Sequence, residues 1–268
     1  MLAGLSQINI ELNSTCGKHT HCAFCGHQDA AVHPQRQDGE MPKAMVAELA
    51  ADLAPLGKNL VVQFHRDGDP LSATHLGWAL MAFSANTRSL VTHGDGLDRR
   101  AQEIVSHCEA VTVSIFRGDP DRDRQLTSLT AFLDLKGERL PRVLLKIVGG
   151  MTDGEFEPYA RLGLPVLSRR LHLPESNRRY TGGLPPLPEH GVCLDLLAHP
   201  SVAWDGRVSV CNRLDATGRG VLGTLATHTL DDIWNGPVRK EILGHHLRGQ
   251  RQAVPFCSTC TYYGVPAA

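Results

Sequence analysis

The sequence predicts an α/β protein built on a parallel β-sheet that is either open or partly closed as a barrel. Segments with strand character alternate with segments of helical periodicity between residues 7 and 173. A chain of 268 residues can bury a sizeable core without needing disulfides or structural metals for stability. Three cysteines, Cys16, Cys22 and Cys25, directly follow the first strand. Parallel sheets carry their sites at the C-terminal ends of strands, so this loop is the first place to look for function.

Six predicted strands are rich in β-branched residues and end at turn residues. They span 7–12, 59–65, 88–94, 110–116, 142–150 and 165–173. Five predicted helices lie between them, and each connects two neighbouring strands. They span 42–57, 74–85, 98–108, 125–137 and 154–163. Pro42 and Gly57 mark the start and end of the first helix, and Pro158 bends or breaks the last. This strand–helix alternation indicates βαβ units and hence parallel strands.

The composition changes at "PESNRRYTGGLPPLPEHG", where Pro and Gly are dense and the periodicity stops. We therefore predict a barrel or sheet domain over 1–175, a linker over 176–190 and a small domain over 191–268. Within that small domain, "SVAWDGRVSVC" predicts a hairpin around Asp205-Gly206. The stretch 230–249 predicts a helix that is interrupted near Gly236-Pro237.

Charge and hydropathy exclude several classes of function. The chain has 27 basic and 28 acidic residues, a net charge of −1, so no overall attraction to nucleic acid or anionic membranes follows. No apolar run approaches the length of a membrane span, so we expect no membrane association. The N-terminal "MLAGLSQINIEL" lacks the features of a signal peptide, which predicts a cytoplasmic protein. Eight cysteines in that compartment indicate metal or redox chemistry more than disulfides.

The cysteines form two sets and a singleton, Cys108, which we interpret as a buried apolar residue. The first set has the spacing C-x5-C-x2-C. Either a histidine (His19, His21 or His27) completes a structural zinc site, or one metal position stays open for chemistry. The second set can close a four-cysteine site for zinc or an iron–sulfur cluster. Its members are Cys193, Cys211, Cys257 and Cys260.

The chain resembles the radical S-adenosylmethionine (SAM) enzymes that end in a twitch domain, the short form of the SPASM domain. That family's usual motif is C-x3-C-x2-C with an aromatic residue before the third cysteine. Here the first spacing is two residues longer, and Phe24 holds the aromatic position. The resemblance implies a partial (β/α)6 TIM-like barrel in which Cys16, Cys22 and Cys25 bind three irons of a [4Fe–4S] cluster. The fourth iron would bind SAM, and Phe24 would pack by its adenine.

The resemblance also implies positions that bind SAM. "RDGDPL" stands where the family has a Gly-Gly-Glu-Pro-like turn, with Gly68, Asp69 and Pro70 matching and Asp67 replacing the first glycine. Further implied contacts come from later strands. They are Ser114 for the ribose or carboxylate, Ile147 in "KIVGGMTD" for the adenine, and Arg169 or Arg170 for the carboxylate.

The C-terminal residues resemble the twitch pattern. Gly206 leads to Cys211 with the family's spacing, "IWN" follows at 233–235, and "CSTC" supplies Cys257 and Cys260. The resemblance implies one auxiliary [4Fe–4S] cluster with four protein ligands, including Cys193. Full ligation favours an electron-transfer or structural role for it.

The implied function is reductive cleavage of SAM to a 5′-deoxyadenosyl radical that takes a hydrogen atom from an amino-acid- or nucleoside-type substrate. Oxidation or rearrangement would follow, as in an oxidoreductase or isomerase. Alternatives are radical modification of a modified nucleobase in DNA, for example phage DNA, a peptide-modifying maturase, and a non-enzymatic zinc-binding module. Arg178 and Arg179 in the linker are candidate contacts for an anionic substrate. Expected partners are an electron donor such as flavodoxin or ferredoxin, and a small-molecule substrate or modified nucleic acid.

Overall fold

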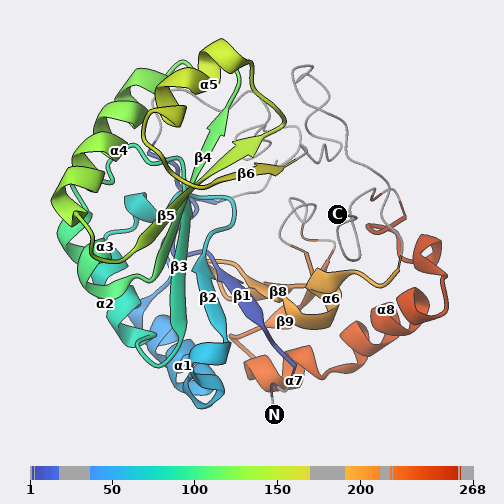
Figure 1. Cartoon of the computed structure of the whole chain (residues 1–268). Coiled ribbons are helices and arrows are strands. Elements are labelled where there is room, and N and C mark those ends of the chain that lie inside the picture. The colour runs from blue at the N-terminus through green and yellow to red at the C-terminus, as the bar shows by residue number, and fades with distance from the viewer. Residues whose placement is uncertain are drawn as a thin grey trace.

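A computed structural model describes residues 2, 4–17, 37–169, 191–211, 218, 220–258 and 260. Its nine strands form one sheet in the order β6-β5-β4-β3-β2-β1-β7-β8-β9. The first six pair in parallel through β1–β2, β2–β3, β3–β4, β4–β5 and β5–β6. These strands curve together with helices along their outer side (Figure 1). The predicted fold class, an α/β partial barrel of parallel strands, is confirmed.

The ends of the barrel strands agree with the predicted segments to within four residues, and those of β4 coincide with them. They are β1 (Gln7–Ile10), β2 (Val61–Phe64), β3 (Thr87–Thr92), β4 (Ala110–Phe116), β5 (Arg142–Val148) and β6 (Val166–Arg169). Five helices alternate with them as predicted. They are α1 (Lys43–Leu53), α2 (Leu76–Ala82), α3 (Ala101–His107), α4 (Arg122–Lys136) and α5 (Asp153–Ala160). Short 3-10 helices, η2 (Ala54–Asn59) and η3 (Pro70–Ser72), flank β2.

The outer face of the barrel sheet carries the apolar core. One aligned row across five strands is made entirely of buried apolar side chains, all exposed by 5% or less. It consists of Ile10, Phe64, Leu90, Val111 and Val143. Apolar side chains of α1 to α4, such as Leu49 and Phe132, belong to the same core cluster. Because each strand and helix buries one face here, its apolar residues recur with the period of that element, and both kinds of element can be predicted from the sequence.

One aligned row on the inner face of the same strands is polar. Asn9, Gln63 and Ser89 are aligned neighbours one position along from the apolar row, so they point to the opposite side. Asn9 is almost fully buried, and its Oδ1 accepts hydrogen bonds from Gln63 Nε2 at 2.8 Å and Gln7 Nε2 at 3.2 Å. These hydrogen bonds give the buried Asn9 side chain polar partners inside the protein.

The C-terminal residues extend the barrel sheet. The predicted hairpin is present, and its first strand pairs in parallel with β1. The elements here are α6 (Leu194–Ala198), β7 (Ser201–Val202), β8 (Arg207–Ser209), β9 (Val221–Thr224), α7 (Leu230–Trp234), α8 (Pro237–Leu247) and η6 (Arg251–Ala253). The predicted interruption of the last helix separates α7 from α8. We did not predict α6 or β9, which are short and depend on partners distant in sequence.

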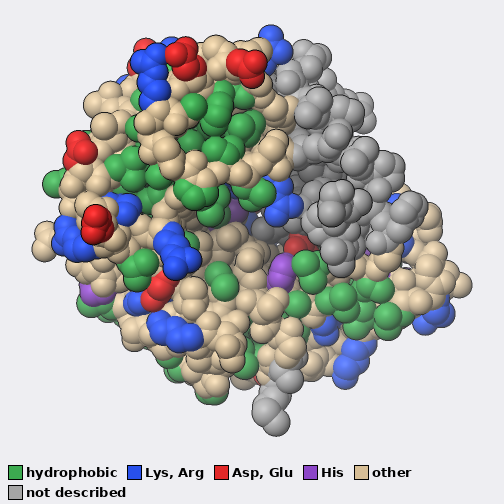
Figure 2. All heavy atoms as spheres, in the orientation of Figure 1, with side chains coloured by type: hydrophobic (Ala, Val, Ile, Leu, Met, Phe, Trp, Pro, Cys, Tyr) green, Lys and Arg blue, Asp and Glu red, His purple; other side chains and the backbone are tan. Residues whose placement is uncertain are grey.

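None of the helices in the described ranges has the length and apolar character that crossing a membrane requires. On the face shown in Figure 2, Lys and Arg side chains are interspersed with Asp and Glu among the described residues.

Candidate cofactor site at the C-terminal ends of the strands

Cys16 lies in the segment after β1 and is partly buried. Two hydrogen bonds hold the chain just before it: Asn13 Nδ2 donates to the Thr15 carbonyl at 2.8 Å and to Thr15 Oγ1 at 2.9 Å. The next residue, Gly17, lines a cavity of about 230 Å³, together with Asp69, Ser72 and His93. The first cysteine of the predicted cluster set thus stands beside a cavity at the C-terminal ends of β1, β2 and β3.

The turn at Asp67–Asp69 packs directly against this segment. The Asp69 N–H donates to the Thr15 carbonyl at 2.9 Å. A Cβ on Gly68 would lie 2.0 Å from the carbonyl oxygen of Asn13, far inside contact distance. The matched Gly is therefore required by the close approach of two backbones, which no side chain allows.

The Asp69 side chain connects the turn after β2 to the end of β3. Its carboxylate accepts the N–H of Leu71 at 2.9 Å and the N–H of His93 at 2.9 Å. Thr92 Oγ1 lies 2.9 and 2.8 Å from the two carboxylate oxygens. This side chain is committed to protein donors, so a ligand at the turn would be met by its main chain.

Replacing Gly68 by Ala should displace the turn from the cysteine segment. We expect SAM affinity to fall at least tenfold, about 1.4 kcal/mol, because the added methyl cannot fit against a main-chain oxygen. Calorimetric titration of the reconstituted protein with SAM measures this. Gly154→Ala is the matched control, since a Cβ there meets nothing within 4 Å. Equal affinity in the Gly68 variant and the wild type would contradict the packing argument.

Ser114 and Arg169 share the inner face at the mouth of the barrel. Ser114 is aligned with Lys146 on the neighbouring strand. Val148 lies two residues after Lys146 and is aligned with Arg169. Alternation along the strands therefore places Ser114, Lys146 and Arg169 on one side of the sheet. In this register Arg169 lies on the inner face, whereas Arg170 lies outside the described residues.

Ile147 lies on the other face. It is aligned with Ile115, which is fully buried in the core, and it packs against that core. Its side chain thus belongs to the layer between sheet and helices. An adenine contact from this position, as predicted, would have to use the main chain.

A buried histidine–aspartate pair, which we did not predict, also lies at this edge. His93 Nε2 is 2.5 Å from Asp119 Oδ2, and the two side chains are 7% and 1% exposed. Gln125 Nε2 donates to the carbonyls of His93 and Ser114, and Tyr159 donates to Gln125 Oε1. Burial, and next the charge of Asp119, raise the pKa of Tyr159. The available signal was the placement of His93 and Asp119 just after neighbouring strands.

The four cysteines of the second set all lie in the C-terminal part of the chain. Cys193 precedes α6, Cys211 follows β8, and Cys257 and Cys260 follow η6. Burial, and next the neighbouring Cys193 and Cys260, raise the pKa of Cys257 to about 12. A cation bound at Cys257 would oppose this shift, because it favours the thiolate over the thiol.

Among the described residues, no three His, Cys, Asp or Glu side chains stand in an arrangement ready to hold a metal ion. Several predicted site residues lie outside the described residues. They are Cys22, Phe24, Cys25, Arg170, Arg178 and Arg179. Cys108 is buried, and its thiol lies 3.1 Å from the Ala110 carbonyl, which agrees with its interpretation as a core residue.

Residues 193–261 match the family model of SPASM, an iron–sulfur cluster-binding domain. Across the whole chain, the fold is that of BtrN in complex with AdoMet and 2-DOIA. The TM-score is 0.67 at 18% identity, over 96% of this chain and 93% of BtrN. SuiB of Streptococcus suis, bound to the precursor peptide SuiA, is also similar. Its TM-score is 0.57 at 12% identity, over 89% of this chain and 66% of SuiB. No curated protein matches the chain in sequence.

Proposed function

We propose that the chain is a radical SAM enzyme that acts on a small polar substrate of the amino-acid or nucleoside type. The observation that carries the proposal is the position of the turn at Gly68–Asp69. This turn packs against the segment that contains Cys16, and both border the same cavity. Two further findings support it. The chain ends in an iron–sulfur domain, and its fold is that of BtrN and SuiB, which are radical SAM enzymes.

Cys16, Cys22 and Cys25 would hold a [4Fe–4S] cluster with one open iron. The donor set fits, since three thiolates are one short of the four that close such a site. When bound, the cluster supplies the electron that splits SAM into methionine and a 5′-deoxyadenosyl radical. An external donor such as flavodoxin or ferredoxin would supply that electron.

The protein's own residues bind and orient SAM. The main chain of the turn at Gly68 would hold the amino group, because the Asp69 side chain is already used by Leu71, Thr92 and His93. Arg169, which shares the inner face with Ser114 and Lys146, would pair with the carboxylate. Fixing both ends of methionine aims the ribose carbon at the substrate and keeps water from the radical.

Cys193, Cys211, Cys257 and Cys260 would close the auxiliary cluster. Four protein ligands leave no position for substrate, so the role is electron transfer or structure. The raised pKa of Cys257 fits this set, because a cation there replaces protons on crowded thiols.

The polar inner face supports a small polar substrate. Asn9, Gln63, Ser89 and Ser114 line it, and the His93–Asp119 pair stands at its mouth. Side chains of this kind can hydrogen-bond the hydroxyl and amino groups of a small polar ligand. A histidine held by a buried carboxylate is also suited to exchange a proton during oxidation or rearrangement.

Anaerobic purification with metal analysis tests the proposal. We expect a brown protein with roughly eight irons and eight sulfides, as two four-iron clusters require. Incubation with SAM and dithionite should release 5′-deoxyadenosine, measured by chromatography. A colourless protein with about two zincs and no SAM cleavage would instead identify a zinc-binding module.

A further inference from the structure

We propose that Glu11 is a positioning residue that fixes the SAM-binding turn to the C-terminal domain, so that SAM affinity depends on the contact between the two. This inference rests on the proposed function, because it takes the turn at Gly68 as part of the SAM site. It assigns Glu11 no contact with SAM itself.

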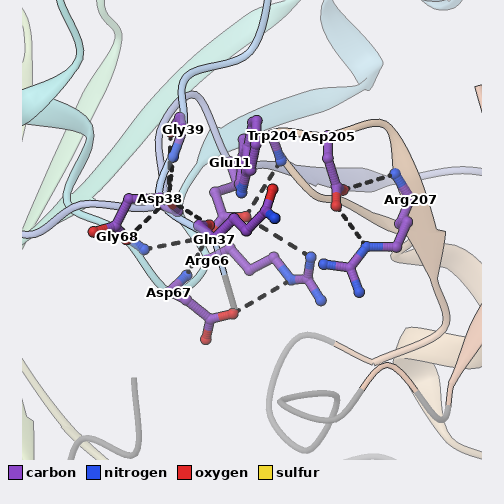
Figure 3. Close-up of polar contacts among 11 residues, drawn as sticks. Glu11, Gln37, Asp38, Gly39, Arg66, Asp67, Gly68, Trp204, Asp205 and Arg207 are labelled. Atoms are coloured by element: carbon purple, nitrogen blue, oxygen red, sulfur yellow. Dashed lines mark hydrogen bonds and ion pairs between the residues drawn. The ribbon is translucent and has the colours of Figure 1, made fainter. Parts of the chain in front are cut away.

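The carboxylate of Glu11 joins two loops that are far apart in sequence (Figure 3). Glu11 directly follows β1 and is only 2% exposed. Its Oε1 accepts the N–H groups of Asp67 and Gly68, both at 3.3 Å. Its Oε2 accepts the N–H of Trp204, also at 3.3 Å. Asp67 and Gly68 belong to the turn after β2, whereas Trp204 lies in the turn between β7 and β8, so one side chain serves both.

A buried cation accompanies this carboxylate. Arg66 Nη1 lies 3.9 Å from Glu11 Oε2, and the two side chains are 5% and 2% exposed. Arg66 Nε lies 3.8 Å from the Asp67 carboxylate. Apolar side chains of similar volume often stabilise a protein as much as a buried ion pair does, or more. The pair between Arg66 and Glu11 therefore favours a role in fixing one arrangement of the two loops.

The same turn of the C-terminal domain reaches the segment that follows the cysteine loop. A Cβ on Gly39 would lie 2.2 Å from the ring of Trp204, so the ring packs flat against this glycine. The Gly39 N–H donates to Ser14 Oγ at 2.8 Å. Trp204 therefore contacts Glu11 through its main-chain N–H and Gly39 through its ring.

An ionised carboxylate is the group that this position needs. It accepts hydrogen bonds on both oxygens, so it can serve the SAM turn and the hairpin together. An amide of the same shape accepts on one atom and donates on the other. Glutamine at position 11 would therefore release one of the two loops and leave a buried N–H facing another donor.

The test compares Glu11→Gln with Asp205→Asn in reconstituted protein. Asp205 is the matched control, because it lies beside Trp204 and bonds only the neighbouring Arg207 in the part of the chain described. Titration calorimetry with SAM, without reductant, gives the dissociation constant at a temperature well below unfolding. We expect about tenfold weaker binding in the glutamine variant and wild-type affinity in the control, with unchanged iron content in both.

Thermal unfolding separates positioning from mere stability. A Glu11→Gln protein that melts earlier but binds SAM like the wild type would overturn the proposal. If that variant does not fold, Glu11→Asp takes its place, since it keeps the charge but shortens the reach. Unaltered SAM affinity in Glu11→Asp would then also overturn it. Failure of the wild-type protein to bind SAM would contradict the proposed function instead.

Discussion

Replacing Cys16, Cys22 and Cys25 together by Ala should remove about half of the iron and abolish SAM cleavage. Without these thiolates no iron position remains to bind the amino and carboxylate groups of SAM. The C-terminal cluster should stay, because its proposed cysteine ligands lie more than 160 residues away in the sequence. Iron and sulfide analysis gives the first result, and chromatography of 5′-deoxyadenosine gives the second.

Cys108→Ala is the control for this experiment. Cys108 is buried in the core between sheet and helices and belongs to neither cysteine set. Its replacement should cost a little stability and no iron. SAM cleavage that survives the triple replacement would show that the cluster is held elsewhere.

Replacing Cys257 by Ala should remove the auxiliary cluster and destabilise the C-terminal domain. Val254 and Phe256 next to it are buried in the main core, so the metal site and the packing of this segment are linked. Metal binding in such small domains is part of folding free energy, so the loss should amount to several kcal/mol and lower the melting temperature by about ten degrees or more.

The same variant should keep about half of its iron and still cleave SAM in the absence of substrate. Both follow because the proposed ligands of the first cluster, Cys16, Cys22 and Cys25, are left unchanged. Iron analysis measures the cluster content of this variant, and thermal unfolding measures its stability. Full iron content together with an unchanged melting temperature would remove Cys257 from the predicted ligand set.

The turn at Gly68 and the inner-face position of Arg169 show how much can be predicted from local sequence patterns. The "RDGDP" turn was readable because a glycine and a proline interrupt two periodic segments. That Arg169 points inward follows from its alignment with Val148, two residues beyond Lys146. Sequence alternation predicts that one of two adjacent arginines faces inward, and only the pairing register says which one.

The sequence by itself determined the alternation of strands and helices, the break between α7 and α8, and the two cysteine sets. All of these depend on residues close together in the chain, whose periodicity, turn chemistry and spacing are local. The tertiary structure alone decided that β7 joins the sheet beside β1, that His93 meets Asp119, and that Glu11 binds Gly68 and Trp204 together. Residues 11 and 204 are brought together by strand pairing across nearly the whole chain. Such a pairing depends on which distant surfaces bury one another, and no local pattern encodes it.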